Sequence, residues 1–263
     1  MTQLADKVIW ITGASSGIGE ALAISASQRG AKLVLTSRRG AELQRVRGLC
    51  AEPGKVAVLP IDLTAFDADD AAVRAAAFFG PVDILVNNAG WSQRGLVADT
   101  DLSVYRKLLE LDFFAPVALT RAVLPGMRQK GDGHIVMIGS IVSKIGTPLR
   151  SGYCAAKHAL DGFTEAARAE LWQENIRFTF IMPGFIRTAV TVNALDATGN
   201  AHGKMDPSTD KGMDPAECAE GIWRAVENNR DEAIVSRYEW AAVKVKRFLP
   251  GLYRYALKRA KVT

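Results

Sequence analysis

Residues 12–19 read Thr12-Gly13-Ala14-Ser15-Ser16-Gly17-Ile18-Gly19 and follow the short apolar run Val8–Ile11. Glycines at this spacing let the backbone turn tightly and approach a bound group closely. The amphipathic stretch Glu20–Arg29 predicts a helix, whose N-terminus presents free N–H groups and the positive end of its dipole. A strand, a glycine-rich turn and a helix in this order indicate a site for the pyrophosphate of a dinucleotide. The spacing differs from the common G-x-G-x-x-G fingerprint, so a turn without a ligand stays open as the alternative.

Short apolar runs alternate with longer amphipathic stretches along the first two thirds of the chain. This alternation predicts an α/β protein, a single-domain Rossmann fold with a doubly wound, mostly parallel sheet and helices on both faces. The expected strands are Val8–Ile11, Lys32–Thr36, Val56–Leu59, Ile84–Val86, Ile135–Ile138, Phe178–Ile181 and Ala233–Val235. The expected helices are Glu20–Arg29, Ala41–Cys50, Ala68–Phe79, Leu102–Leu124 as one helix or two, Ser151–Glu174 and Pro215–Glu227.

The chain shows no repeat or low-complexity linker, so we expect residues 1–263 to form one catalytic domain. A length of 263 residues is compatible with a single α/β unit. Thr188–Met213 is rich in Gly, Asn and Pro and shows little periodicity. Loops of this length inside compact domains are usually functional, so we predict that residues 188–213 form the substrate-binding loop.

Basic residues concentrate at the C-terminal end of the chain. The segment 237–263 holds eight Lys or Arg and one acidic residue, whereas the whole chain carries a net charge of +5. The body is therefore slightly acidic, which argues against a nucleic-acid partner. Phe248, Leu252 and Ala256 recur every four residues and suggest a short amphipathic helix interrupted by Pro250. Such a helix packs on its own domain or on a second copy, the interpretation we favour, or makes a weak peripheral contact with an anionic membrane.

The cysteines and histidines are few and scattered. Cys50, Cys154 and Cys218 lie far apart and match no zinc or redox spacing, so we predict no metal site. The N-terminal residues lack the pattern of a secretory signal, and no apolar run approaches the length of a membrane span. We therefore expect a cytoplasmic protein, with peripheral membrane contact as the open alternative.

Two arginines follow the second expected strand, in the order Thr36-Ser37-Arg38-Arg39. In NAD-binding sites an acidic residue near this point binds the ribose 2′-hydroxyl, whereas an arginine accommodates the 2′-phosphate of NADP. A guanidinium matches phosphate geometry with two parallel hydrogen bonds. The sequence therefore predicts NADP(H) as the cofactor, with NAD(H) the less favoured choice; the alternative is that both arginines are solvated.

A hydroxyl, a phenol and an amine lie within eighteen residues of one another in the second half of the chain. Tyr153 and Lys157 are four residues apart and so share a helix face. A neighbouring ammonium favours the phenolate and lowers the pKa of a tyrosine, which suits the tyrosine to exchange a proton with a carbonyl or alcohol oxygen. Ser140 follows the fifth expected strand, where its hydroxyl can hold the same oxygen. Alone, the Tyr-x-x-x-Lys pair is more often a packing or surface pair.

Taken in order, these motifs resemble the classical short-chain dehydrogenase/reductase family. The matching residues span about 175 positions. They are Thr12-Gly13-x-x-x-Gly17-x-Gly19, Asp62-Leu63, Asn87-Asn88-Ala89-Gly90, Ser140, Tyr153-x-x-x-Lys157, and Pro183-Gly184 with Thr188.

The resemblance implies a role for each matching position. Tyr153 is expected to be the general acid or base, Ser140 to orient the substrate carbonyl, and Lys157 to lower the tyrosine pKa and bind the nicotinamide ribose. Homodimers or homotetramers are expected to form through helices placed at Leu111–Met127 and Ser151–Glu174. The expected cofactor residues are Gly13, Ser15, Ser16, Gly17, Ile18, Gly19, Arg38, Arg39, Asp62, Leu63, Asn88, Gly90, Tyr153, Lys157, Pro183, Gly184, Ile186 and Thr188.

One position departs from the family pattern. Where the family usually has an asparagine that helps hold a water relay to the lysine, this chain has Asp112. We count Asp112 among the expected catalytic residues, because a carboxylate can accept hydrogen bonds from water and pair with the Lys157 ammonium. Such a pair would partly cancel the positive field at Tyr153. The alternative is that Asp112 points away and caps a helix junction.

These observations predict an NADP(H)-dependent oxidoreductase that interconverts a carbonyl and an alcohol. The alternative is an NADP-binding sensor or scaffold with impaired catalysis, which the departure at Asp112 favours and the intact Ser140, Tyr153 and Lys157 oppose. The runs 143–148 and 249–253 are also similar to a membrane-associated subgroup, some of whose members act on steroid or retinoid carbonyls.

Overall fold

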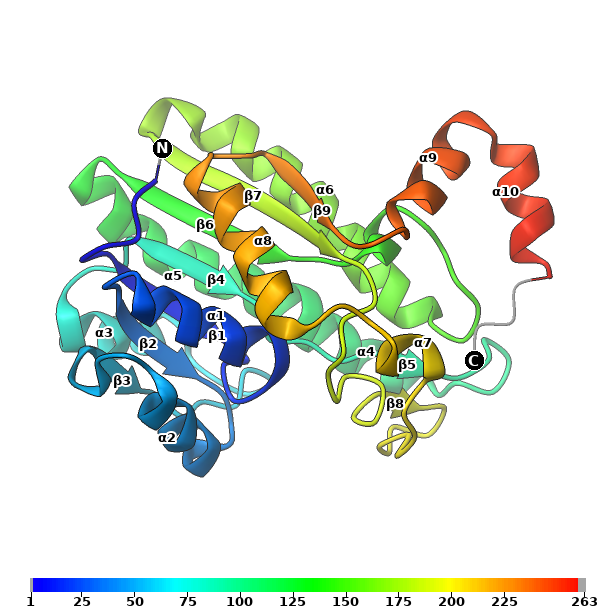
Figure 1. The fold of residues 1–263 in the computed structure, drawn as a ribbon, viewed down its shortest axis with the longest axis horizontal. Helices are drawn as coiled ribbons and strands as arrows, with labels where there is room; N and C mark the ends of the chain where they lie inside the picture. Colours follow the sequence, from blue (N-terminus) through cyan, green and yellow to red (C-terminus); the bar gives the residue numbers. More distant parts are fainter. Residues whose placement is uncertain (1, 260–263) are drawn as a thin grey trace.

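A seven-stranded parallel sheet forms the centre of the protein (Figure 1). The computed structural model describes residues 2–259; the end of the basic tail, including Lys261, lies outside this range. The strand order is β3-β2-β1-β4-β6-β7-β9, so the chain winds outward from β1 in both directions, and the predicted doubly wound sheet is confirmed. The strands are β1 Val8–Thr12, β2 Lys32–Thr36, β3 Val56–Val58, β4 Ile84–Asn87, β6 Gly133–Ile138, β7 Ile176–Pro183 and β9 Glu232–Val235.

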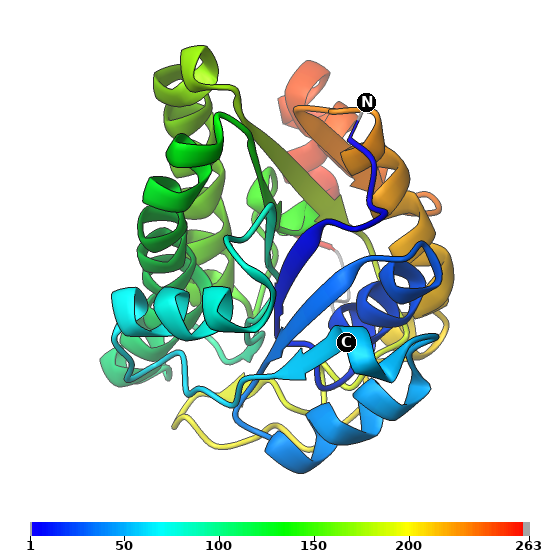
Figure 2. The same ribbon diagram turned by 90° about the vertical axis from the view of Figure 1, so that its left-hand side faces the viewer.

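Helices cover both faces of the sheet, as Figure 2 shows in a view along the layers. One layer contains α3, α5 and α6, and the other contains α1, α2 and α8. Neighbouring side chains of a strand point to opposite faces: Ile9 and Ile11 of β1 join the core on one side, and Trp10 joins the core on the other. The helices are α1 Gly17–Gln28, α2 Gly40–Leu49, α3 Ala68–Phe79, α5 Ala115–Lys130, α6 Ser151–Leu171 and α8 Pro215–Glu227.

The stretch predicted as one helix or two from Leu102 to Leu124 contains an irregular turn. Helix α4, Leu102–Leu109, passes through a π-helical segment, Glu110–Phe114, into α5. Pro116 at the start of α5 has no N–H with which to continue the α-helical hydrogen bonds. Single π-helical turns are frequent at functional sites, and this one turns Asp112 into the protein, where its side chain is fully buried.

The predicted substrate loop, 188–213, is more ordered than its composition indicates. Its strand β8, Leu195–Asp196, pairs in parallel with β5, Gln93–Arg94, and the one-turn helix α7, Pro207–Asp210, follows. Two-residue strands leave no periodic pattern in a sequence, and their pairing depends on a partner a hundred residues away. The small β5–β8 sheet holds the loop beside the carboxyl ends of the main strands.

The basic tail forms two helices, α9 Trp240–Phe248 and α10 Pro250–Leu257, which project from the sheet in Figure 1. Pro250 begins the second helix, a position where its missing N–H costs nothing. Ala242, Val243 and Tyr253 pack on the domain's own core, and the Tyr253 hydroxyl donates a hydrogen bond to the Gly146 carbonyl at 2.7 Å.

The apolar stripe predicted on the tail does not make this contact. Phe248, Leu252 and Ala256 are exposed, so the packing surface is formed by a different set of residues. Packing of the tail on its own domain is thus confirmed, and contact of the exposed stripe with a membrane or a second copy remains a prediction. Within residues 2–259, the helices are all too short or too polar to cross a bilayer.

Candidate active site

A cavity of about 950 Å³ opens at the carboxyl ends of the strands. It lies where the strand order reverses between β1 and β4, the place at which open α/β sheets bind ligands. Gly19 and Asp112 lie just behind its wall. The predicted residues that line it are Gly13, Ser15, Ser16, Gly17, Ile18, Arg38, Arg39, Asp62, Leu63, Asn88, Gly90, Ser140, Tyr153, Lys157, Pro183, Gly184, Ile186 and Thr188.

The turn after β1 requires its glycines. Gly13 and Gly17 have φ of +64° and +61°, the left-handed region that other residues rarely adopt. A Cβ added at Gly19 would lie 2.4 Å from the Gly13 carbonyl oxygen. Asn88 holds the turn from β4, because its Nδ2 donates to the Thr12 carbonyl at 2.9 Å. The turn is therefore a rigid backbone cradle at the start of α1.

The two arginines after β2 differ in position. Arg39 reaches the glycine turn, where its Nη2 donates to the hydroxyls of Ser15 at 2.9 Å and Ser16 at 2.8 Å. Arg38 lies 5.1 Å over the ring of Trp91 and 3.9 Å from the Asp62 carboxylate. Two guanidiniums thus lie on the cavity wall beside the glycine turn.

The opposite end of the cavity is connected to the tail by hydrogen bonds. Glu239, just before α9, accepts a hydrogen bond from the Phe185 N–H at 2.9 Å, and its other oxygen accepts from the Tyr238 N–H at 3.0 Å. A Cβ added at Gly184 would lie 2.7 Å from the Glu239 carboxyl carbon. Glu239 lines the cavity, and sequence reasoning missed it because a single glutamate in a basic tail carries no motif.

Ser140, Tyr153 and Lys157 meet in the cavity as predicted. Ser140 begins the 3-10 turn after β6 and caps it, its side chain accepting from the Val142 N–H. Tyr153 and Lys157 extend from the first turns of α6; the Lys157 ammonium lies 5.8 Å from the centre of the Tyr153 ring. The Lys157 side chain is buried and donates to the Ile138 carbonyl at 3.0 Å. A phenol, a hydroxyl and an ammonium therefore face one space.

The pKa of Tyr153 differs from the expectation. Burial raises the pKa of this phenol above its usual value, and the nearby Asp112 carboxylate raises it further, while a hydrogen bond from Ser140 lowers it. The predicted lowering of the tyrosine pKa is therefore wrong for this arrangement of protein groups, because desolvation disfavours the phenolate more strongly than its polar neighbours favour it. In this environment the phenol keeps its proton and is a donor at neutral pH.

Asp112 points inward, as the first of the two predicted alternatives requires. Its Oδ1 accepts the Trp91 N–H at 2.8 Å, and its Oδ2 has no hydrogen-bond partner among the described residues. A Cβ added at Gly90 would lie 2.6 Å from Oδ1 and 3.4 Å from the Lys157 ammonium. Burial raises the pKa of Asp112 to about 6, against the opposing effects of Lys157 and the Trp91 N–H. The alternative in which Asp112 points away is wrong.

Sequence reasoning missed three charged residues of the cavity region. Arg94 on β5, Arg150 before α6 and Asp206 before α7 are buried and form one ion-pair cluster. They are separated by more than fifty positions along the chain, so no local pattern connects them.

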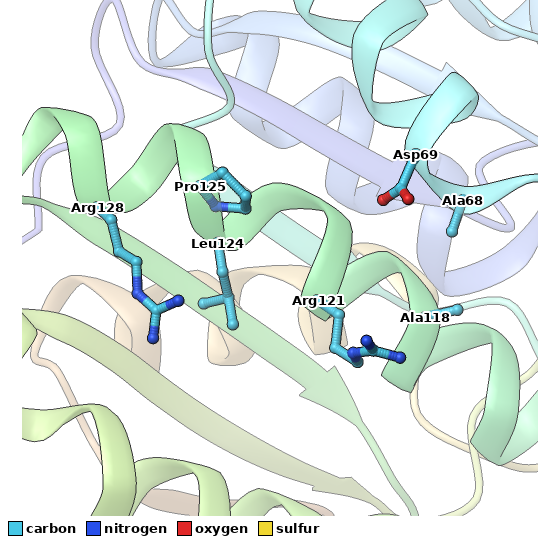
Figure 3. Close-up of a pocket in the computed structure, with 7 residues that line it drawn as sticks. All are labelled: Ala68, Asp69, Ala118, Arg121, Leu124, Pro125 and Arg128. Carbon is cyan, nitrogen blue, oxygen red and sulfur yellow. The ribbon is translucent and has the colours of Figure 1, made fainter.

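A second hollow of about 340 Å³ lies between α3 and α5, away from the strand ends (Figure 3). Arg121, Leu124 and Arg128 extend from α5, and Asp69 lies on α3. None of the predicted site residues lines it.

A carboxylate cluster also lies outside the cavity, where Asp161, Glu165 and Glu232 bring oxygens within 4.8 Å of one another. The Lys144 ammonium lies 2.9 Å from both Asp161 and Glu232, so the cluster is an ion-pair network that joins α6 to β9.

Comparison with known proteins agrees with this geometry. The family model described as short chain dehydrogenase matches residues 7–198. The Drosophila melanogaster protein "Dehydrogenase/reductase SDR family protein 7-like" is 40% identical over 98% of this chain and 82% of its own length. The human protein "Dehydrogenase/reductase SDR family member 7" is 48% identical over 73% of this chain and 59% of its own length.

Solved structures share the fold. A short-chain dehydrogenase from Streptomyces avermitilis has a TM-score of 0.80 and 29% identity, covering 97% of this chain and 100% of its own. A short-chain dehydrogenase/reductase from Burkholderia phymatum, solved in complex with NAD, has a TM-score of 0.85 and 22% identity over 96% of each chain, a likeness of fold alone. With the family match spanning most of the chain, and with the cavity built from the family's motifs, this protein belongs to the short-chain dehydrogenase/reductase family of oxidoreductases.

Proposed function

We propose that this protein is an NADP(H)-dependent oxidoreductase that interconverts a carbonyl and an alcohol. The observation that carries the proposal is the single cavity in which the backbone cradle at Gly13–Gly19 and the trio Ser140, Tyr153 and Lys157 lie together. The cradle suits a dinucleotide, because its glycines let the backbone pack closely against Asn88, Ala89 and Thr188 at the start of α1, where free N–H groups can meet a phosphate. A bound nicotinamide would supply or accept the hydride.

Tyr153 then acts as general acid or base on the substrate oxygen. Its raised pKa favours the protonated phenol, so in the reductive direction Tyr153 donates its proton to the oxygen of the carbonyl. Ser140 positions that oxygen, since it lines the same cavity as Tyr153. Lys157 contributes positive charge beside the phenol and a donor for the nicotinamide ribose, and Asp112, whose carboxylate is buried nearby, helps to hold the water relay to Lys157.

Arg38 and Arg39 favour NADP(H) over NAD(H). Arg39 lies at the hydroxyls of Ser15 and Ser16 and Arg38 beside it, and no acidic residue replaces them at the end of β2. Asp62 and Leu63 border the adenine, Asn88 and Gly90 line the groove, and Pro183, Gly184, Ile186 and Thr188 contact the nicotinamide.

The substrate binds under residues 188–213, eight of which line the cavity. The protein acts as a homodimer or homotetramer through α5 and α6, which lie side by side on one face of the sheet (Figure 2). Exposed Phe114, at the start of α5, suits such a contact.

The test is turnover with a panel of ketones, aldehydes and alcohols, followed by NADPH absorbance with NADH in parallel. We expect carbonyl-dependent oxidation of NADPH at a higher kcat/KM than that of NADH. Tight NADPH binding without turnover of any compound would instead favour a sensor or scaffold that has lost catalysis.

A further inference from the structure

The buried charges beside the cavity are unequal in number. Two guanidiniums, those of Arg94 and Arg150, share one carboxylate, that of Asp206, and all three side chains are less than a tenth exposed. In residues 2–259, Asp206 is the only carboxylate that pairs with either arginine. The cluster therefore carries one uncompensated positive charge, and a buried charge needs a partner of opposite sign.

The hydrogen bonds show which arginine carries the excess. Arg94 uses four of its five N–H donors: two nitrogens donate to Asp206, and a third donates to the Ser92 hydroxyl and the Gln93 carbonyl. Arg150 makes one hydrogen bond among the described residues, from Nη2 to Asp206 Oδ2 at 3.1 Å. A guanidinium has five N–H donors, so most of those of Arg150 remain available.

Arg150 lies at the end of the cavity that holds Tyr153. It lines the cavity and lies three residues before Tyr153, close enough that its charge lowers the pKa of that phenol. The amide groups that begin α6 are not available to a ligand, because the Gln93 side-chain oxygen accepts from the Gly152 N–H at 2.7 Å. The walls of the cavity are largely apolar and include Ile141, Val142, Ile145, Val190 and Leu195.

We propose that Arg150 is a specificity-determining residue that binds an anionic group of the substrate, and that the substrates are carbonyl or alcohol compounds with an apolar body and one carboxylate. Arg94 and Asp206 hold Arg150 in place and anchor the substrate loop above it. A carboxylate bound to Arg150 balances the cluster's charge and directs the carbonyl toward Tyr153. This inference rests on the proposed oxidoreductase function and adds the substrate class.

The test compares substrates that differ only in charge. The pairs are 4-formylbenzoate with its methyl ester and 6-oxohexanoate with its methyl ester, which together sample two distances between aldehyde and carboxylate. With NADPH and the wild-type protein, we expect kcat/KM for at least one acid to exceed that for its ester by about ten- to hundredfold, mainly through KM, as for a hydrogen bond to a charged group. Equal values in both pairs would overturn the proposal without any variant.

Variants then separate anion binding from loop anchoring. Arg150→Gln leaves Asp206 paired with Arg94, so the cluster loses its excess positive charge and becomes neutral. We expect the fold to be kept, which thermal unfolding checks. We expect the ratio of kcat/KM for the acid to kcat/KM for the ester to fall to about one in this variant, and Arg150→Lys to restore part of the preference. Arg187→Gln is the matched control, because it removes an exposed guanidinium that pairs with Asp214 outside the cavity. Equal losses on acid and ester in Arg150→Gln would show that Arg150 only anchors the loop.

Failure of the proposed function has a different signature. If neither aldehyde is reduced, calorimetric titration of the NADPH-loaded protein with each acid and ester still tests the inference. Tighter binding of an acid, lost in Arg150→Gln, supports anion recognition without turnover, whereas equal affinities of acid and ester overturn it.

Discussion

The two ends of the cavity are built in different ways. At the proposed cofactor end, the continuous eight-residue segment Thr12–Gly19 supplies the cradle, and two neighbouring arginines lie beside it. At the substrate end, Arg94, Arg150 and Asp206 come from three distant segments and meet as buried charges. Backbone geometry within one turn is encoded locally, whereas a buried ion cluster exists only once the surrounding chain excludes water. The cofactor end can therefore be recognised in a sequence, and the substrate end cannot.

Replacing Tyr153 by Phe should produce the largest difference between the effect on turnover and the effect on cofactor binding. The ring is kept and the proton donor is removed, so turnover should fall by about 10²–10⁴-fold, while NADPH affinity stays within about threefold. Steady-state rates and calorimetry measure the two effects. Tyr105→Phe is the matched control, because Tyr105 lies on α4 and does not line the cavity. Its hydroxyl forms a hydrogen bond with Ser151 at the start of α6. More than about a tenth of wild-type activity in Tyr153→Phe would argue against a proton-transfer role.

Asp112→Asn tests how much the buried Asp112 carboxylate lowers the free energy of unfolding. Because the pKa of Asp112 is raised to about 6 in the fold, the folded state binds its proton more tightly than the unfolded state, and stability falls as the pH rises from about 4 to about 6. The amide cannot ionise, so the variant should be more stable than wild type above pH 6, by on the order of 3 kcal/mol.

Denaturant unfolding at pH 4.5 and at pH 7.5 measures this difference in stability. The advantage of the variant should be small at the lower pH and larger at the higher one. A variant that is less stable than wild type at both pH values would show that the Asp112 carboxylate makes favourable interactions that outweigh its desolvation.

The arginines at the cofactor end should set nucleotide choice. Arg38→Ala and Arg39→Ala should each weaken NADP(H) binding by about 1.5–3 kcal/mol, the loss of one charge-assisted contact, and leave NAD(H) binding nearly unchanged. Titrations of both nucleotides into each variant give the result, with Arg74→Ala on the exposed surface of α3 as the control. Equal affinities of the wild type for both nucleotides would contradict the proposed preference.

Asp112→Asn should also shift the pH dependence of alcohol oxidation. Asp112 raises the pKa of Tyr153, and the phenolate is the form that accepts the proton in this direction. Removing the carboxylate should therefore move the rate profile to lower pH, by roughly one unit or less, within the usual range for one neighbouring charge. Rates of alcohol oxidation by wild type and variant, measured across the alkaline range, test this shift. Superimposable profiles would show that Asp112 does not affect the pKa of Tyr153.

The smallest expected effect belongs to the tail. Tyr253→Phe removes the hydrogen bond to the Gly146 carbonyl and should lower the free energy of unfolding by about 1 kcal/mol. Tyr255→Phe, which alters an exposed ring on the same helix, should have almost none. Thermal unfolding compares them. Equal stabilities of the two variants would show that the tail contributes little through this contact.

Much of the fold followed from sequence patterns. Each of the seven expected strands lies within a strand of the main sheet or extends one residue beyond it, because buried parallel strands are short apolar runs between amphipathic helices. The π-helical turn at Glu110–Phe114 and the β5–β8 pair were missed. Both depend on contacts with the rest of the chain and leave no periodic signal.

The sequence by itself determined the fold class and predicted the glycine turn and the site residues Ser140, Tyr153 and Lys157, since these rest on short patterns that occur together in a fixed order along the chain. Only the tertiary structure decided the direction in which the pKa values of Tyr153 and Asp112 are shifted and the pairing of Arg94, Arg150 and Asp206. The physical reason is desolvation: the energy of a charge depends on how much water the whole fold removes from it and on which partners the fold brings near. Neither quantity is a property of neighbouring positions in the chain.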